Sequence, residues 1–381
     1  MPLIINLVPI RAGGGLQNTL SFLNFFHLHS PFDPSQYLII CNMNSEIADY
    51  CAEYNLNFFA IPNSKLARIK YELFYGMYLF RKHHADTVFS IFGGAPLISF
   101  GVRKISGFAY SNLIQPEVPF WNFLPFRKRI WKLLIDKLRL FLAKHSDELI
   151  LETDYLSYRA KQGIFSGKII HTIKMAPSAV VLSSLYATKK PSRESSNDTK
   201  RILYLSGPHK NKRIHLLARV FQQLNNNKQR YILLTTLPES SSYLDEIKRE
   251  FAEAGVSSFL SNLGPVPASN LGDLLRSVDG MINVALLESF SNNWVEAWAV
   301  GIPLITTDAD WARASCGDAA IYVNPESPDI AAERILAVFS SRERMKTMQQ
   351  LGFRQLDSLP TPEGKFWQYI SIIKGSKKDI R

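Results

Sequence analysis

Short apolar runs alternate with amphipathic stretches of helical period along most of this 381-residue chain. The runs predict buried strands, and the stretches between them predict helices that cover a parallel sheet, so the alternation favours a doubly wound α/β fold. The expected strands are residues 3–8, 37–42, 57–61, 87–92, 148–152, 169–174, 201–205, 231–235, 258–260, 280–284, 303–307 and 320–323. The expected helices include residues 16–27, 66–83, 127–145, 214–224, 243–254, 270–276, 292–300 and 330–339.

The alternation stops at residues 187–200 and begins again after them. This segment, ATKKPSRESSNDTK, is polar and has no apolar period, which is typical of a linker. We therefore expect two Rossmann-like domains, residues 1–186 and 201–360, that face each other across a cleft. Ligands of doubly wound sheets bind beyond the carboxyl ends of the strands, so we expect the functional residues in the loops that follow the strands.

The net charge of +11 is concentrated in the first half of the chain. Residues 1–190 contain 21 Lys and Arg against 12 Asp and Glu. Such an excess predicts an anionic partner. The sequence has no nucleic-acid-binding motif, and the basic residues gather on one predicted helix, which favours an anionic membrane surface over nucleic acid.

That predicted helix covers residues 126–146 and has two interpretations. It contains seven Lys and Arg against one Asp, and its apolar residues recur at helical spacing: Ile130, Trp131, Leu134, Leu138, Phe141 and Leu142. One interpretation is a core-packed apolar face with a solvated basic face. The other is an interfacial helix that binds anionic lipid, with about 1 kcal/mol from each basic residue near the surface.

Other features of the sequence indicate a cytoplasmic protein without a bound metal. No apolar stretch reaches the roughly 18 residues of a spanning helix, and the N-terminal apolar run is too short for a secretory signal. Cys41, Cys51 and Cys316 show no pairing motif, and the histidines form no metal-binding pattern. We expect buried thiols, no cofactor, and a location in the cytoplasm or at the inner face of the cytoplasmic membrane.

The most informative stretch is ALLESFSNNWVEAWAVGIPLITTD, residues 285–308. A predicted strand leads into a turn with Glu288, and a polar bend then leads into a helix with Glu296. The unbonded amides of a helix N-terminus suit a diphosphate, and the two carboxylates suit sugar and ribose hydroxyls. The alternative is a solvated helix capped by Ser289 or Ser291, with Glu296 as a surface charge.

Glu288 and Glu296 also stand eight residues apart, as in the Glu-x7-Glu motif of retaining glycosyltransferases of the GT-B fold. With their flanks, residues 286–327, they resemble glycosyltransferase family 4, and the resemblance covers roughly residues 200–340. It implies that Glu288 contacts the transferred sugar as a catalytic residue and that Glu296 contacts the ribose. It also implies donor contacts at the diphosphate from Phe290, Ser291 and Asn292.

A basic turn follows the strand at residues 201–205. A lysine there can neutralise the charge that develops on a departing diphosphate. The turn resembles a family subgroup with Pro-His-Lys-Asn, which implies that Lys210 is the catalytic phosphate-binding lysine, with Gly207 at the donor. Counting back from the following helix selects Lys212 instead, and a solvated basic loop is the third interpretation. No arginine occupies the position ahead of the lysine that is usual in the family, where Gly207 or Pro208 stands instead.

The first half of the chain carries weaker signals. Gly14 and Gly15 open the first predicted helix, where backbone without side chains can approach donor phosphates. Their sequence, GGGLQ, lacks the spacing of a nicotinamide-binding loop. Many family members have a histidine near the reacting sugar, but residues 105–120 contain none. Asn112 and Gln115 are the acceptor candidates there, and core or loop roles for them remain open. No general base is assigned.

The resemblance implies an enzyme that transfers a hexose, with retention, from a nucleotide-diphosphate sugar to a glycan or lipid-linked acceptor in O-antigen or capsule synthesis, without a metal. A catalytically silent nucleotide-sugar-binding protein is the main alternative, and a GT-B epimerase or phosphorylase is another. Members of this fold usually end with a helix that returns to the N-terminal domain, and residues 361–381 are the candidate for it.

Overall fold

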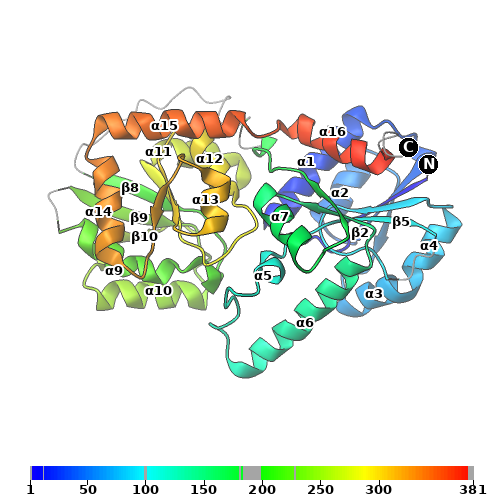
Figure 1. Cartoon of the computed structure of the whole chain (residues 1–381), viewed down its shortest axis with the longest axis horizontal. Helices are drawn as coiled ribbons and strands as arrows, with labels where there is room; N and C mark the ends of the chain where they lie inside the picture. Colours follow the sequence, from blue (N-terminus) through cyan, green and yellow to red (C-terminus); the bar gives the residue numbers. More distant parts are fainter. Residues whose placement is uncertain are drawn as a thin grey trace. The chain divides into compact units, whose positions relative to one another are not determined.

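The computed structural model describes residues 2–11, 13–97, 101–179, 182, 199–226 and 229–375. The chain forms two compact units, an N-terminal unit of residues 1–175 with 360–381 and a C-terminal unit of residues 176–359 (Figure 1). The second unit thus begins ahead of the boundary expected at residue 186. The expected linker lies outside the described residues, apart from Thr199 and Lys200, which begin a strand.

A seven-stranded parallel sheet, in the order β3-β2-β1-β4-β5-β6-β7, forms the centre of the N-terminal unit. Its strands are β1 (Leu3–Asn6), β2 (Tyr37–Asn42), β3 (Phe58–Ile61), β4 (Thr87–Ser90), β5 (Arg103–Gly107), β6 (Glu148–Leu151) and β7 (Ile169–Thr172). Its helices are α1 (Gly13–His29), α2 (Glu46–Glu53), α3 (Lys65–Lys70), α4 (Gly76–Lys82), α5 (Ser111–Ile114), α6 (Phe126–Lys144), α7 (Asp154–Gln162) and α16 (Pro362–Lys374). A π-helical turn at residues 71–75 separates α3 from α4, where one helix was expected.

The last helix, α16, is part of the N-terminal core. Phe366 and Tyr369 contact Phe22 of α1, with ring centroids 5.5 and 5.8 Å apart. Arg103 of β5 donates hydrogen bonds to the carbonyls of Ile372 and Ile373 in the last turn of the helix. Helix α16 is therefore fixed to the N-terminal unit by both apolar contacts and hydrogen bonds.

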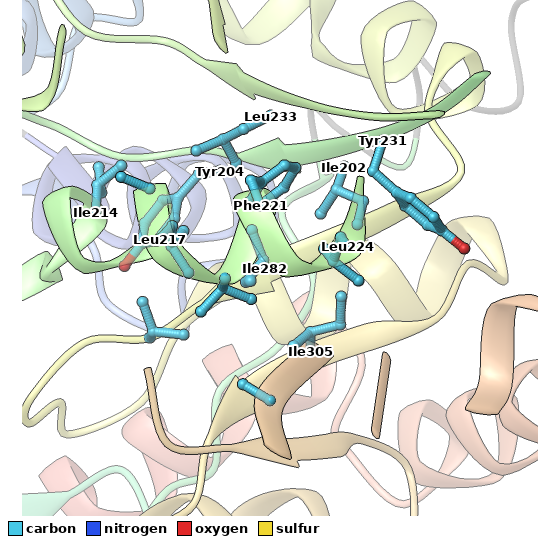
Figure 2. Packing of buried hydrophobic residues seen from close by; sticks show 14 of the residues in the cluster. Ile202, Tyr204, Ile214, Leu217, Phe221, Leu224, Tyr231, Leu233, Ile282 and Ile305 are labelled. Atoms are coloured by element: carbon cyan, nitrogen blue, oxygen red, sulfur yellow. The ribbon is translucent and has the colours of Figure 1, made fainter. Parts of the chain in front are cut away.

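A six-stranded parallel sheet, in the order β10-β9-β8-β11-β12-β13, forms the centre of the C-terminal unit. Its strands are β8 (Thr199–Tyr204), β9 (Arg230–Thr235), β10 (Leu260–Asn262), β11 (Gly280–Asn283), β12 (Leu304–Thr307) and β13 (Ile321–Val323). Its helices are α9 (Leu217–Leu224), α10 (Ser242–Glu253), α11 (Leu271–Ser277), α12 (Asn292–Val300), α13 (Asp310–Cys316), α14 (Pro328–Phe339) and α15 (Arg342–Asp357). Figure 2 shows Leu217, Phe221 and Leu224 of α9 packed against the sheet residues Ile202 and Leu233.

Strand order reverses direction in both sheets, between β1 and β4 and between β8 and β11. On either side of such a switch point the connections leave toward opposite faces of the sheet, which opens a crevice at the carboxyl ends of the two central strands. The loops that follow β8 and β11 are therefore the expected ligand-binding loops of the C-terminal unit.

The structure contradicts the core-packed interpretation of α6. Among its residues only Asp136 and Ala143 are buried. Its expected core residues Ile130, Trp131, Leu134, Leu138 and Phe141 are exposed, Trp131 to 65%. The helix therefore presents apolar and basic side chains together on the surface of the N-terminal unit. No helix in the described part of the chain is both long and apolar enough to cross a bilayer.

Candidate functional site

Two loops meet at the switch point of the C-terminal sheet, residues 205–213 after β8 and residues 284–291 after β11. Asn211 connects them. Its side-chain amide donates to the Leu287 carbonyl at 2.9 Å, and its backbone carbonyl accepts from the Leu286 amide at 2.8 Å. Its side-chain oxygen lies 3.3 Å from the Leu287 amide. Because Asn211 is buried, these bonds fix the basic turn against the loop that carries Glu288.

Lys212 and Glu288 form an ion pair across these two loops. The second carboxylate oxygen of Glu288 accepts a hydrogen bond from Asn283 at 3.1 Å. The side chains of Lys212 and Glu288 are 21% and 10% exposed, so the pair is shielded from bulk water but remains accessible. The loop geometry thus presents one cation and one carboxylate at the same point.

Lys210 has a different partner. Its ammonium nitrogen lies 2.5 Å from a carboxylate oxygen of Glu246 on α10, and its side chain is 42% exposed. Lys210 and Lys212 both belong to a short 3₁₀ turn, residues 210–212, yet only Lys212 pairs with Glu288. The sequence left the choice between the two lysines open, and the structure places Lys212 with the Glu288 carboxylate.

Asn283, at the end of β11, connects several residues of this site through hydrogen bonds. Its amide nitrogen donates to both Glu288 and Ser291, the latter at 2.7 Å. Its amide oxygen lies 3.1 Å from the hydroxyl of Tyr204, which also donates to the Lys212 carbonyl at 2.7 Å. Burial raises the pKa of Tyr204 well above its ordinary value, so this hydroxyl keeps its proton and acts as a donor.

Arg213 supplies a second cation that the sequence did not reveal. Its backbone is left-handed, with φ of 53°, and its guanidinium donates to the Val284 carbonyl at 2.9 Å. Its side chain is only 13% exposed, and burial lowers its pKa, although an arginine remains charged at neutral pH. The position ahead of the lysine, where the family usually has an arginine, holds Gly207 or Pro208, whereas Arg213 follows the lysine.

The N-terminus of α12 lies beside these charges. Ser291 precedes the helix, and its hydroxyl accepts from Asn283 and makes no capping hydrogen bond to α12. The first turn also contains no acidic residue. A helix N-terminus attracts anions through its amides and its dipole. The ring of Phe290 packs on Trp294, with centroids 5.0 Å apart, so Phe290 can serve this site through its backbone. Asn292 opens the helix and is half-buried.

Glu296 is buried on α12 and lines a small cavity. The residue is 5% exposed, and one of its carboxylate oxygens is buried without a hydrogen-bond partner among the described residues. The cavity has a volume of about 10 Å³, and its other walls include Ala176, Pro177 and Leu182. Burial raises the pKa of Glu296 to about 7. This placement contradicts the interpretation of Glu296 as a solvated surface charge.

The glycines expected at the donor lie in two different units. Gly14 and Gly15 are in the first turn of α1 in the N-terminal unit. A Cβ on Gly15 would make an ordinary contact with Phe92 at 3.7 Å. Gly207 belongs to the C-terminal unit, in the loop after β8, and a Cβ on it would meet no atom within 4 Å. Open space therefore adjoins Gly207, on the loop that also contains Lys212.

Asn112 and Gln115, the acceptor candidates, make contacts inside the N-terminal unit. Asn112 donates to the Asp136 carboxylate at 2.7 Å. Gln115 is buried, and its oxygen accepts from the Tyr155 hydroxyl at 3.3 Å. The amide nitrogen of Gln115 has no hydrogen-bond partner among the described residues. Asn112 therefore has a structural contact of its own, whereas Gln115 retains an unbonded donor.

The three cysteines are buried, and burial raises the pKa of Cys41 and Cys51 to about 12. At neutral pH they are protonated and poor nucleophiles. Across the residues that the structure describes, no cluster of three or more His, Cys, Asp or Glu side chains could hold a metal ion.

Comparisons with known proteins find a similar domain and similar folds. Residues 199–341 match the family model for Glycosyl transferases group 1. The chain is similar to the structure of a glycosyltransferase from Rickettsia africae ESF-5, with 14% identity, a TM-score of 0.75, and coverage of 100% of this chain and 99% of that one. A search of curated protein sequences finds no match.

Two further structures are similar at the level of the fold. WaaG, a glycosyltransferase involved in lipopolysaccharide biosynthesis, shows 14% identity and a TM-score of 0.70, with 98% of this chain and 100% of that one covered. HepE from Anabaena, in complex with UDP and glucose, shows 12% identity and a TM-score of 0.68, with 99% and 100% covered. Residues 199–341 are therefore similar to the Glycosyl transferases group 1 domain, and the chain has the two-unit α/β fold that these glycosyltransferase structures share, the GT-B fold.

Proposed function

We propose that this protein transfers a hexose, with retention of anomeric configuration, from a nucleoside diphosphate sugar to a glycan or lipid-linked acceptor in O-antigen or capsule synthesis. The observation that carries the proposal is the Lys212–Glu288 pair, held by Asn211 and Asn283 next to the N-terminus of α12. A cation, a helix N-terminus and a carboxylate at one point suit a diphosphate joined to a polar sugar.

In this proposal, donor binding exchanges the partners of the ion pair. Lys212 moves to the diphosphate together with the α12 amides, and Glu288 accepts hydrogen bonds from hydroxyls of the transferred sugar. The bond between the anomeric carbon and the phosphate oxygen breaks while the acceptor oxygen bonds to the same face of that carbon. The acceptor proton passes to the leaving phosphate, so no protein base is required. Lys212 stabilises the charge that develops on the diphosphate, and Arg213 adds positive potential beside it.

Glu296 has the role of ribose ligand in the proposal. A buried carboxylate oxygen without a partner carries a free-energy penalty, and two ribose hydroxyls would relieve it by donating hydrogen bonds. The cavity at Glu296 has room for about one water molecule, so donor binding requires the segment that begins at Ala176 to move away from α12. Glu296 therefore becomes accessible to the ribose only when the donor binds.

The surface of α6 supports an acceptor at a membrane. Its exposed apolar residues and its seven Lys and Arg suit the interface of an anionic bilayer. The likeness to WaaG, a lipopolysaccharide enzyme, agrees with a surface-glycan acceptor. We accordingly place the protein in the cytoplasm, on the inner face of the cytoplasmic membrane, with no resident cofactor or metal.

The proposal is tested by donor binding followed by turnover. A thermal-shift screen across UDP-, GDP- and dTDP-hexoses identifies the donor, because a ligand at about 100 times its dissociation constant stabilises by roughly 2.7 kcal/mol. Slow release of free sugar, with the α-anomer formed first from an α-linked donor in an NMR time course, is the result we expect. Binding without any consumption, even with membrane extract as the acceptor source, would indicate a silent nucleotide-sugar-binding protein instead.

A further inference from the structure

A pocket of about 550 Å³ lies on the N-terminal unit between α5, the loop of residues 116–122, and α6. Its lining residues belong to the N-terminal unit, whereas the charged residues of the proposed donor site belong to the C-terminal unit. Its walls are mainly apolar and include Leu113, Val118, Ile130, Leu134, Leu140 and Ile164. Its volume is in the range of pockets that enclose small organic ligands.

A buried carboxylate holds this pocket together. Asp136 of α6 is 3% exposed and accepts three hydrogen bonds, from Asn112 at 2.7 Å, from the indole nitrogen of Trp121 at 2.6 Å and from Arg139 at 2.9 Å. These bonds fix α5 and the loop against α6. Arg139 also compensates the charge of Asp136, so these buried polar groups are satisfied by one another, and most of the other lining residues are apolar.

Two cations lie at the border of the pocket. Arg129 and Lys137 both line it and are exposed, and eight residues on a helix place them about 12 Å apart along α6. Within the described residues, neither has a carboxylate partner. An apolar cavity with unpaired cations at its border is complementary to a molecule with an aliphatic chain and an anionic head.

We propose that this pocket binds the aliphatic chain of an anionic lipid, with the lipid phosphate at Arg129 and Lys137. The proposal rests on the function proposed above, because it identifies the occupant as the lipid portion of the acceptor. The attraction between α6 and a membrane is general, whereas this pocket is a specific binding site, because one aliphatic chain of the lipid enters it.

Binding of single amphiphiles below their critical micelle concentration tests the pocket without a membrane. Isothermal titration of the full chain with octyl, decyl and dodecyl phosphate should show affinity that increases by up to roughly fourfold per methylene, the equivalent of about 0.8 kcal/mol. Inorganic phosphate should bind at least tenfold more weakly than decyl phosphate, and decyl glucoside, which lacks the charge, should also bind more weakly. Equal binding of inorganic and decyl phosphate would overturn the proposal.

Matched variants of α6 separate the pocket from the surface. Leu134 lines the pocket and Leu138 does not, although their exposed fractions are similar, 52% and 55%. Leu134→Gln should weaken decyl phosphate binding at least fivefold, whereas Leu138→Gln should leave it unchanged. Lys137→Gln should weaken binding, with Lys128→Gln, which lies outside the pocket, as its control. Equal losses from Leu134→Gln and Leu138→Gln would overturn the pocket and indicate adsorption on the helix surface.

The test is independent of sugar transfer. Donor affinity and donor consumption are measured on the same variants, none of which lies in the donor site. Chain-length-dependent binding in a protein that consumes no donor would support the pocket and contradict the transferase. The opposite pattern, donor consumption without chain-length dependence, would contradict the pocket and leave the transferase in place.

Discussion

At the scale of single residues, the two lysines of the basic turn give the most direct test. Lys212 pairs with Glu288, whereas Lys210 pairs with Glu246 on α10. Lys212→Ala should lower turnover by about 10² or more, the usual cost of losing one charge-stabilising group. Lys210→Ala, two residues away in the same turn, is the matched control and should reduce turnover much less. Steady-state rates with saturating donor measure both, and a larger loss from Lys210→Ala would reverse the assignment.

The two glutamates should affect different kinetic parameters. Glu288 meets the sugar whose anomeric carbon reacts, so Glu288→Gln should lower kcat with a modest change in donor affinity. Glu296 meets the ribose, away from the reacting bond, so Glu296→Gln should weaken donor binding by about 1–3 kcal/mol.

Titration with the intact donor and with the bare nucleoside diphosphate separates the two roles. The Glu296 variant should lose affinity for both ligands, while the Glu288 variant should bind the bare nucleotide normally. Parental binding and turnover in both variants would remove the basis for the transferase assignment.

The pKa of Glu296 predicts a dependence of stability on pH. Its pKa is about 7 in the folded chain against an ordinary 4.5, so the folded state holds this proton more tightly than the unfolded state. The stabilising contribution is therefore complete below pH 4.5 and is lost as pH rises to about 7, with a magnitude on the order of 3 kcal/mol. Thermal melts from pH 5 to 8 should show a smaller decline in Tm for Glu296→Gln than for the parent.

Donor binding should have the opposite pH dependence. Ribose hydroxyls donate to the ionised carboxylate, so binding at pH 6 should release a proton from Glu296, and donor affinity should rise up to about pH 7. Calorimetry in two buffers of different ionisation enthalpy measures that proton. An unchanged proton release in Glu296→Gln would assign the effect to another group.

At the scale of elements, α16 shows how distant parts of the chain share one core. Phe366 is 1% exposed and contacts Phe22, whereas its neighbour Trp367 is 42% exposed. Phe366→Ala should lower the free energy of unfolding by about 3–5 kcal/mol, and Trp367→Ala should change it by less than about 1 kcal/mol. Denaturant melts followed by circular dichroism measure both. Similar losses would mean that α16 is not docked through Phe366.

The helices and strands also show where the local sequence pattern is sufficient to predict an element and its bounds. Strand β2 and helix α12 have the predicted bounds. Strand β2 is an apolar run, and α12 is a helical segment with clear ends at Ser291 and Gly301. Strand β5 was not predicted, because RKISG has two cations and a glycine and no apolar run. It forms a strand because β4 and β6 pair with it on both sides. Gly107 is required by packing, since a Cβ there would lie 1.7 Å from the Ile91 carbonyl oxygen.

At the scale of the whole molecule, the basic N-terminal half predicts electrostatic docking on anionic membranes. Liposome co-sedimentation should increase with anionic lipid and weaken as salt screens the surface charge. Serine at Arg127, Lys128, Arg129 and Lys132 together should abolish binding, while donor affinity, which depends on the C-terminal unit, should remain at the parental level. Equal binding to neutral and anionic vesicles would contradict electrostatic docking.

The sequence by itself determined the α/β class, the alternation of strands and helices in each half of the chain, and the stretch that contains Glu288 and Glu296. These are local properties, because they depend only on strand and helix periods and on the spacing of a motif. Tertiary structure decided which lysine meets Glu288. That choice depends on Asn211, which bonds to Leu287 76 residues later, and on Asn283, which bonds to Tyr204 79 residues earlier. It also decided that the apolar residues of α6 are exposed, because an amphipathic period does not specify whether a core lies opposite the apolar face.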